Sequence, residues 1–141
     1  MGKHRWKLLG AALLAALIIG FALRDSFLRE YVRLRSDALE AFAQSALADC
    51  GGEDLSLRYG SWPVSVWAQA GMVEFHTRQS AAFGGIERGF YYSRDDVPGT
   101  FQGGGYPLRA EDGGWRWEDP YGNHGETWRI LPHWFWYEAV L

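Results

Sequence analysis

The hydrophobic pattern of the chain begins with sixteen residues that carry no charge, from Leu8 to Leu23 (LLGAALLAALIIGFAL). As a helix this stretch covers about 24 Å, which is short against a hydrocarbon core of about 30 Å. Trp6, Lys7 and Arg24 flank it, and side chains of these types reach the membrane interface. The pattern predicts an N-terminal membrane anchor over residues 1–24.

Two other interpretations of the N-terminus remain open. A cleaved signal peptide fits the basic start and the length, although no small-x-small cleavage site directly follows Leu23. A buried helix of a soluble protein is the other interpretation. The continuous apolar character all round this helix argues against it. For an uncleaved anchor, we expect a single-pass membrane protein with its C-terminal domain outside the cytoplasm, because the charged N-terminus directly precedes the span.

Residues 25–50 show the apolar spacing of an amphipathic helix. No Pro or Gly interrupts residues 21–50, so we expect the membrane helix to continue directly into this one. Gly51 and Gly52 provide the stop, because glycine accepts the left-handed conformation at a helix C-terminus. The apolar stripe consists of Leu28, Val32, Leu39, Phe42 and Ala46.

After residue 52 the apolar residues recur at every second position, which is typical of strands. Asp112-Gly113 predicts a hairpin turn, and residues 127–141 are expected to form one last strand with Pro132 at a bend or edge. Residues 51–141 should therefore form one antiparallel sheet of about four to six strands. With the amphipathic helix packed on it, the predicted fold class is α+β.

Composition and charge limit the classes of partner that the protein can bind. The chain has 141 residues, of which 48% are hydrophobic and 22% charged, as in a globular protein. The net charge of −3 is uneven, because residues 1–35 carry +5 and residues 36–141 carry −8. An acidic folded part argues against nucleic acid as a partner. The basic part suits anionic lipid headgroups, and the expected membrane partner is the lipid bilayer through residues 8–23.

Aromatic residues make up 16% of the chain and include eight Trp, several of them close together near the C-terminus. On a sheet with one open face, such side chains would form a surface that binds a protein, peptide or glycan. The competing interpretation is that both aromatic sets are buried, since aromatic residues are common in small sheets. The candidate ligand-binding residues are Trp115, Trp117, Trp128, Trp134, Trp136 and Tyr121.

The sequence predicts no catalytic residue, cofactor or metal site. Its four His residues have no His or Cys partner at metal-ligand spacing, and its one Cys excludes an internal disulfide. We therefore favour a membrane-anchored, non-enzymatic binding domain. One alternative is a small cell-envelope hydrolase that uses a pair of carboxylates; the candidates are Glu118, Asp119, Glu126 and Glu138. Another is a self-associating envelope protein, because small residues in the span permit close helix approach; these are Gly10, Ala11, Ala15 and Gly20.

Three motifs in the second half of the chain are distinctive in combination: GFYYSRDDVPG at 89–99, GWRWED at 114–119 and RILPHWFWYE at 129–138. Together with the apolar N-terminus, they resemble a group of small, uncharacterised, single-pass bacterial membrane proteins with a FYYS-DD stretch and a Trp/Tyr-rich end. The resemblance covers about the last fifty residues and implies anchoring and fold, with no activity. The matching residues are Phe90, Tyr91, Tyr92, Ser93, Asp95, Asp96, Trp115, Trp117, Arg129, Ile130, Trp134, Tyr137 and Glu138.

Overall fold

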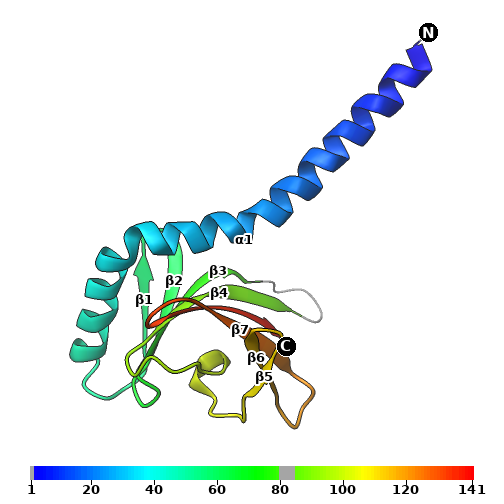
Figure 1. The fold of residues 1–141 in the computed structure, drawn as a ribbon. Helices are drawn as coiled ribbons and strands as arrows, with labels where there is room; N and C mark the ends of the chain where they lie inside the picture. Colours follow the sequence, from blue (N-terminus) through cyan, green and yellow to red (C-terminus); the bar gives the residue numbers. More distant parts are fainter. Residues whose placement is uncertain (1, 80–84) are drawn as a thin grey trace. The chain divides into compact units, whose positions relative to one another are not determined.

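The computed structural model describes residues 2–79 and 85–141, apart from the side chains at 2–9, 11, 17, 18, 21, 22 and 24. The predicted interfacial residues Trp6, Lys7 and Arg24 therefore lie outside the described side chains. The chain forms two compact units, Met1–Leu34 and Arg35–Leu141. Its elements (Figure 1) are α1 (Gly2–Asp49), β1 (Leu55–Tyr59), β2 (Trp62–Trp67), β3 (Met72–Arg78), β4 (Ile86–Ser93), η1 (Phe101–Gly103), β5 (Arg109–Glu111), β6 (Gly114–Glu118), β7 (His124–Leu131) and β8 (Trp134–Val140).

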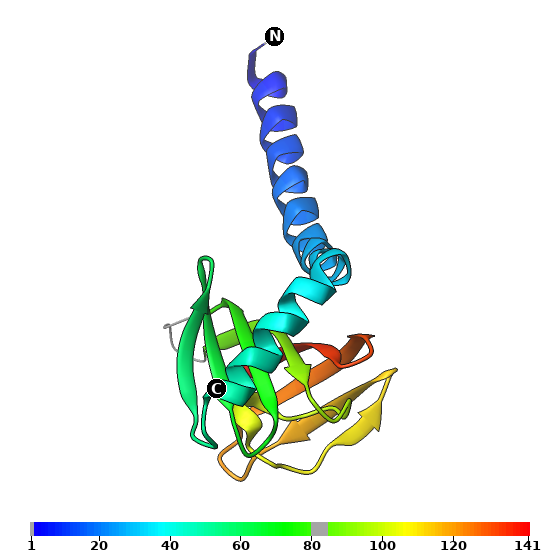
Figure 2. The ribbon, with the colours of Figure 1, turned by 90° about the vertical axis from the view of Figure 1, so that its left-hand side faces the viewer.

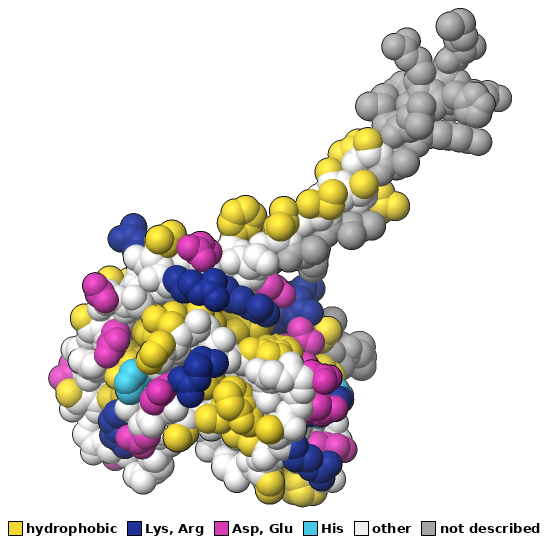
Figure 3. Space-filling model, in the orientation of Figure 1, with side chains coloured by type: hydrophobic (Ala, Val, Ile, Leu, Met, Phe, Trp, Pro, Cys, Tyr) yellow, Lys and Arg dark blue, Asp and Glu magenta, His cyan; other side chains and the backbone are white. Residues whose placement is uncertain are grey.

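The first unit is the N-terminal part of α1, which is helical from Gly2 onward. Its described apolar side chains are largely exposed, including Leu13, Leu14, Ile19 and Leu23. Hydrophobic side chains accordingly cover much of the coloured part of this helix in the space-filling view (Figure 3). Among the described residues, no helix is both long enough and apolar enough to cross a membrane.

The second unit begins with residues 35–49 of α1, which pack on the sheet through the predicted apolar stripe. Leu39, Ala43 and Ala46 are buried, and the ring of Phe42 lies 5.0 Å from that of Tyr59 and 5.8 Å from that of Phe75. In this part of the chain, the amphipathic helix is confirmed. It ends at Asp49, one residue before the predicted end, and two glycines with positive φ follow after Cys50.

All eight strands form one antiparallel sheet in the order β1-β2-β3-β4-β8-β7-β6-β5. The sheet consists of two four-strand meanders that join where β4 pairs with β8, and β1 and β5 form its edges. The α+β class is confirmed, while the expected four to six strands were too few. The Asp112-Gly113 hairpin is also confirmed, because both residues have positive φ between β5 and β6.

The prediction of a single last strand over residues 127–141 was wrong. The segment is a hairpin of β7 and β8, with Leu131 paired to Trp134 across a two-residue turn. His133 takes the left-handed backbone conformation in this turn, with φ of 66°. Pro132 therefore lies in a reversal of the chain, and not at a bend within one strand.

Both faces of the sheet are covered. Residues 35–49 of α1 cross the strands on one side, which we call the outer face (Figure 2). The segment between β4 and β5, with η1, runs across the other side, which we call the inner face (Figure 1). The rings of Phe75, Phe90 and Trp134 gather on the outer face. The inner face holds a second buried cluster built from Met72, Tyr91, Phe101, Trp117, Phe135, Tyr137 and Ala139.

Candidate functional site

The six candidate ligand-binding residues differ in how far they are buried. Trp134 and Trp136 are buried on the outer face, and Trp117 is buried in the inner cluster. These three side chains therefore lie in the interior and do not form an open surface. Their burial follows from the covering of both faces, which the period-two pattern alone does not predict.

The other three candidates remain accessible. Trp115 on β6 and Trp128 on β7 are half-buried and line the same cavity of about 150 Å³. Tyr121 is exposed in the turn between β6 and β7 and lines none of the described cavities. Their side chains project from opposite faces of the sheet, because Trp115 packs on the inner cluster, with its ring 6.0 Å from that of Phe135, while Trp128 lies on the face of Arg116 and Glu126.

This cavity also contains charged side chains. Its other lining residues are Glu111, Asp112, Arg116 and Glu126, which come from β5, β6, β7 and the turn between β5 and β6. Arg116 and Glu111 also line a neighbouring cavity of about 370 Å³, together with Pro107, Arg109, Trp117 and Glu118. We call the two cavities together the β5–β7 groove.

Arg116 lies at the centre of the groove between two carboxylates. Its guanidinium is 3.9 Å from a carboxylate oxygen of Glu111 and 3.8 Å from one of Glu126. Both distances exceed those of hydrogen bonds, so the contacts are electrostatic and leave donors and acceptors available to a ligand. Four acidic and two basic side chains line the groove, which gives it a local charge of −2.

Small residues determine where the large rings of β6 and β7 lie. A Cβ atom on Gly114 would lie 2.5 Å from the Trp128 ring, and one on Gly125 would lie 2.7 Å from the Trp117 ring. Each indole therefore rests directly on a cross-strand glycine, a pairing that protects the glycine backbone and fixes the ring. This positions Trp128 at the wall of the groove and Trp117 in the core beneath it.

Four carboxylates named from the sequence lie in separate environments. Glu118 is exposed, and Glu138 accepts a hydrogen bond from Arg88 at 2.5 Å. Asp119 accepts hydrogen bonds from the backbone N–H groups of Tyr121 and Asn123 and from the Asn123 side chain, which lower its pKa although partial desolvation opposes them. Asp119 thus shapes the turn after β6, and only Glu118 and Glu126 line the groove.

A different carboxyl group has the environment of a general acid. Glu74 on β3 is completely buried on the inner face, and burial raises its pKa to about 8, with a further contribution from the charge of Glu87. Two hydrogen bonds act in the opposite direction: Trp67 Nε1–H donates to one oxygen at 2.6 Å and the Gln102 backbone N–H donates to the other at 2.8 Å. Glu74 thereby fastens η1 to β2 and β3.

A short chain of hydrogen bonds lies near Glu74 on the same face. His76 Nε2 is 2.8 Å from Ser65 Oγ, and His76 Nδ1 is 2.9 Å from the Tyr137 hydroxyl oxygen. Burial lowers the pKa of His76 and raises that of Tyr137 well above 10, so the imidazole is neutral and the phenol protonated. Of the two neutral tautomers of His76, one has the Tyr137 hydroxyl donating to Nδ1 and Nε2–H donating to Ser65, and the other reverses both bonds.

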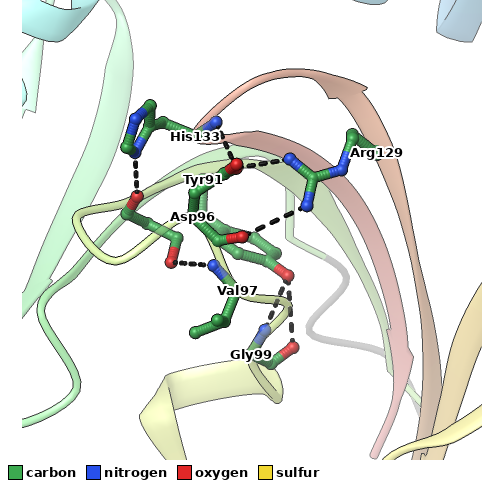
Figure 4. Close-up of polar contacts among 7 residues, drawn as sticks. Tyr91, Asp96, Val97, Gly99, Arg129 and His133 are labelled. Atoms are coloured by element: carbon green, nitrogen blue, oxygen red, sulfur yellow. Dashed lines mark hydrogen bonds and ion pairs between the residues drawn. The ribbon is translucent and has the colours of Figure 1, made fainter.

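The FYYS-DD and RILPHW motifs meet at one surface clamp (Figure 4). Asp96 accepts hydrogen bonds from the Arg129 guanidinium and, at 2.6 Å, from the His133 backbone N–H. His133 Nδ1 lies 2.9 Å from the Ser93 carbonyl oxygen, and Ser93 N–H donates to the His133 carbonyl at 2.7 Å. The bonds that Asp96 accepts, with that from His133 first, lower its pKa. The clamp ties the end of β4 to the β7–β8 turn, which is a structural role for both motifs.

In the β5–β7 groove, predicted aromatic residues and charged side chains line the same cavities. The second unit is thus an α+β domain with a helix on the outer face and an accessible groove with aromatic and charged side chains at one sheet edge. Comparison with known proteins found no match: no family model, curated protein or solved structure matches the chain. The resemblance to small single-pass membrane proteins stays a prediction.

Proposed function

We propose that this protein is a membrane-anchored, non-enzymatic domain that binds a neutral, hydroxyl-rich ligand, such as a glycan, in the β5–β7 groove. The observation that carries the proposal is the arrangement around Arg116. The half-buried indole of Trp128 offers an apolar face, and the guanidinium and carboxylates beside it retain unused hydrogen-bonding capacity. Sites of this kind combine an apolar wall with a few polar groups that fix the orientation of the ligand.

The charge of the groove supports a neutral ligand. An acidic lining disfavours phosphate, nucleic acid and other anions, because they would approach a net charge of −2. Hydroxyl groups avoid this penalty, and they can accept hydrogen bonds from the guanidinium groups of Arg109 and Arg116 while donating to the carboxylates.

Removing Trp128 should weaken binding by about tenfold or more, because it removes an aromatic wall of the groove. Intrinsic tryptophan fluorescence can follow titration with neutral oligosaccharides such as chitotetraose, cellotetraose and maltotetraose. Trp128→Ala should lose the response, while Trp128→Phe, which keeps a ring over Gly114, should lose less. Tyr121→Ala is the matched control, since it deletes an exposed aromatic ring outside both cavities. The proposal fails if no oligosaccharide binds, or if Trp128→Ala and Tyr121→Ala behave alike.

The membrane anchor over residues 8–23 is the second part of the proposal. Leu13, Leu14, Ile19 and Leu23 are 46–64% exposed, and water does not favour so many uncovered apolar side chains on one helix. A lipid bilayer would cover them. With the anchor in place, the acidic second unit would lie outside the cytoplasm.

The full chain should therefore remain in the membrane fraction after alkaline carbonate extraction. The double variant Leu14→Arg/Ile19→Arg should move to the supernatant, because charges at the centre of a span are costly. Phe27→Arg is the control, since it changes an exposed apolar residue outside the stretch. Extraction of the unaltered chain by carbonate would contradict the anchor and leave glycan binding as a separate question. A compartment-sensitive reporter after Leu141 tests the orientation.

A further inference from the structure

The two edges of the sheet differ in how they are protected against pairing with another strand. β5 is only three residues long, begins two residues after Pro107 and carries charges at Arg109 and Glu111. Short length, proline and charge are devices by which edge strands avoid such pairing. β1 has five residues, no proline and a single charged side chain, and its pairs with β2 run without a bulge. The β1 edge therefore lacks the protection that the β5 edge has.

The backbone of β1 offers hydrogen-bonding groups at this edge. Tyr59 pairs with Trp62 across the two-residue β1–β2 turn, so these two residues exchange hydrogen bonds. The bonding alternates along an antiparallel strand, which turns the N–H and C=O groups of Ser56 and Arg58 away from β2. Among the described residues, no backbone group outside β2 bonds to the backbone of β1. β1 forms the margin of the sheet in Figure 2.

The side chains at this edge have different chemistry on the two faces of the sheet. Leu55 and Leu57 pair with buried valines of β2 and so lie on the outer face, where Leu57 is 36% exposed. Ser56 and Arg58 alternate with them, lie on the inner face and are exposed. Asp54 directly precedes β1, and one of its two carboxylate oxygens accepts from a backbone N–H in the β2–β3 turn. The edge thus carries an apolar pair on one face and a negative and a positive side chain near its two ends.

We infer that β1 pairs with β1 of a second copy of this chain, in an antiparallel arrangement centred on Ser56. In this register the backbone groups that point away from β2 meet, and Ser56 lies opposite Ser56 of the second copy. Arg58 lies opposite Asp54 of the second copy, and Leu55 lies opposite its Leu57; symmetry repeats both pairs. Opposite charges and apolar side chains in opposed positions stabilise an antiparallel pair. A register centred on Arg58 would instead place two guanidinium groups opposite each other.

The inference is independent of the β5–β7 groove, because the groove lies at the other end of the strand order. The two-fold axis of such a pair is perpendicular to the sheet. Residues 35–49 of both copies therefore lie on the same face of one continuous sheet, and neither helix stands between the two β1 strands.

Sedimentation of the full chain, in detergent with micelles in excess over chains, should show a concentration-dependent dimer. Ser56→Pro removes an N–H that points away from β2, so the fold tolerates it while the dimer Kd should rise by about tenfold or more. Arg58→Glu places like charges opposite each other and should have a similar effect, and adding Asp54→Arg to it should lower the Kd again. Arg109→Glu is the matched control, since it makes the same charge reversal at the β5 edge and should leave the Kd unchanged.

Cysteine cross-linking tests the register in a Cys50→Ala background. Ser56→Cys should form a disulfide between two chains on mild oxidation, because Cα atoms of such a pair lie about 5.5 Å apart, within the range that a disulfide spans. Arg58→Cys should not, since its own copy lies farther along the strand.

Two results would overturn the inference: a chain that stays monomeric at every concentration, or a dimer whose Kd is the same in Ser56→Pro and Arg58→Glu as in the unaltered chain. The second result would place the contact elsewhere, for example in the N-terminal helix. If Ser56→Pro does not fold, Arg58→Glu and its charge-swapped double variant provide the test.

Discussion

Replacing Gly89 with alanine should unfold the second unit. A Cβ atom at this position would lie 2.0 Å from the Phe75 carbonyl oxygen and 2.9 Å from the Tyr137 ring. The oxygen belongs to the backbone of β3, so relief requires separation of β3 from β4 at the centre of the sheet. We expect a loss of more than about 4 kcal/mol in the free energy of unfolding, which is a large part of a typical domain's stability.

Urea unfolding followed by circular dichroism would measure this loss. Gly60→Ala is the control, because Gly60 lies in the β1–β2 turn with φ of 58° and a Cβ atom there would meet nothing within 4 Å. In that variant only backbone strain should lower the free energy of unfolding, by about 1–2 kcal/mol. Equal urea midpoints for the two variants would show that β3 and β4 accommodate a methyl group, contrary to the expectation.

Gly89 also shows how far a glycine in a strand can be interpreted from the sequence alone. Glycine in a strand predicts a close approach of another group, yet the sequence does not say which. Here two groups approach: the Phe75 carbonyl oxygen on β3, and the ring of Tyr137, which pairs with Gly89 across β4 and β8 and whose hydroxyl is hydrogen-bonded to His76. Gly89 and Tyr137 lie on strands that are far apart in the sequence. The assumption that consecutive strands pair with each other could not have predicted this contact.

The helix and the early strands were predictable because their signals are local. Apolar spacing and two glycines identified the helix through to its end, and Asp112-Gly113 identified a hairpin. The β7–β8 turn was not predictable in this way, because His133 adopts a positive φ that is uncommon outside glycine, and the Pro132-His133 pair is not one of the glycine-containing pairs that indicate a hairpin turn. Without that turn, the number of strands and the order of the sheet could not be derived.

The candidate site was predicted only in part for a related reason. Alternation on β3 places Val73 and Phe75 in a core, which leaves Glu74 and His76 on a face expected to meet solvent. The segment between β4 and β5 covers that face through Phe101, although its run of glycines predicts a flexible loop. The same covering buries Trp117, while Trp115 and Trp128, near the sheet edge at β5, stay accessible.

Burial of Glu74 should make the stability of the domain fall as pH rises. Its pKa is about 8 in the folded chain and near 4.5 when unfolded, so between these values the folded state holds a proton that the unfolded state has released. Stability that is fully present below pH 4.5 is therefore lost progressively up to pH 8. At about 1.36 kcal/mol per pKa unit, the loss reaches about 5 kcal/mol at most. The groups whose charges or bonds act on Glu74 are Trp67, Glu87 and the Gln102 backbone.

His76 imposes the opposite dependence at lower pH. Burial lowers its pKa, so the unfolded chain takes up a proton below about pH 6.5 that the folded chain does not. The contribution of His76 is therefore lost as pH falls. The two groups together place the greatest stability at mildly acidic pH, because above about pH 6.5 only the loss from Glu74 continues. A variant is needed to separate them.

Glu74→Gln isolates the contribution of the carboxyl group. Its amide NH2 would face one of the two N–H donors, from Trp67 or Gln102, so at pH 5 the variant should be less stable by about 1–3 kcal/mol. At pH 8.5 this deficit should shrink or reverse, because the amide has no proton to lose. Glu111→Gln, which changes an exposed carboxyl, should keep the pH dependence of the unaltered chain. Urea unfolding at pH 5, 6.5 and 8.5 gives the difference between variants, and a deficit that stays constant across this range would mean that Glu74 is ionised in the folded protein.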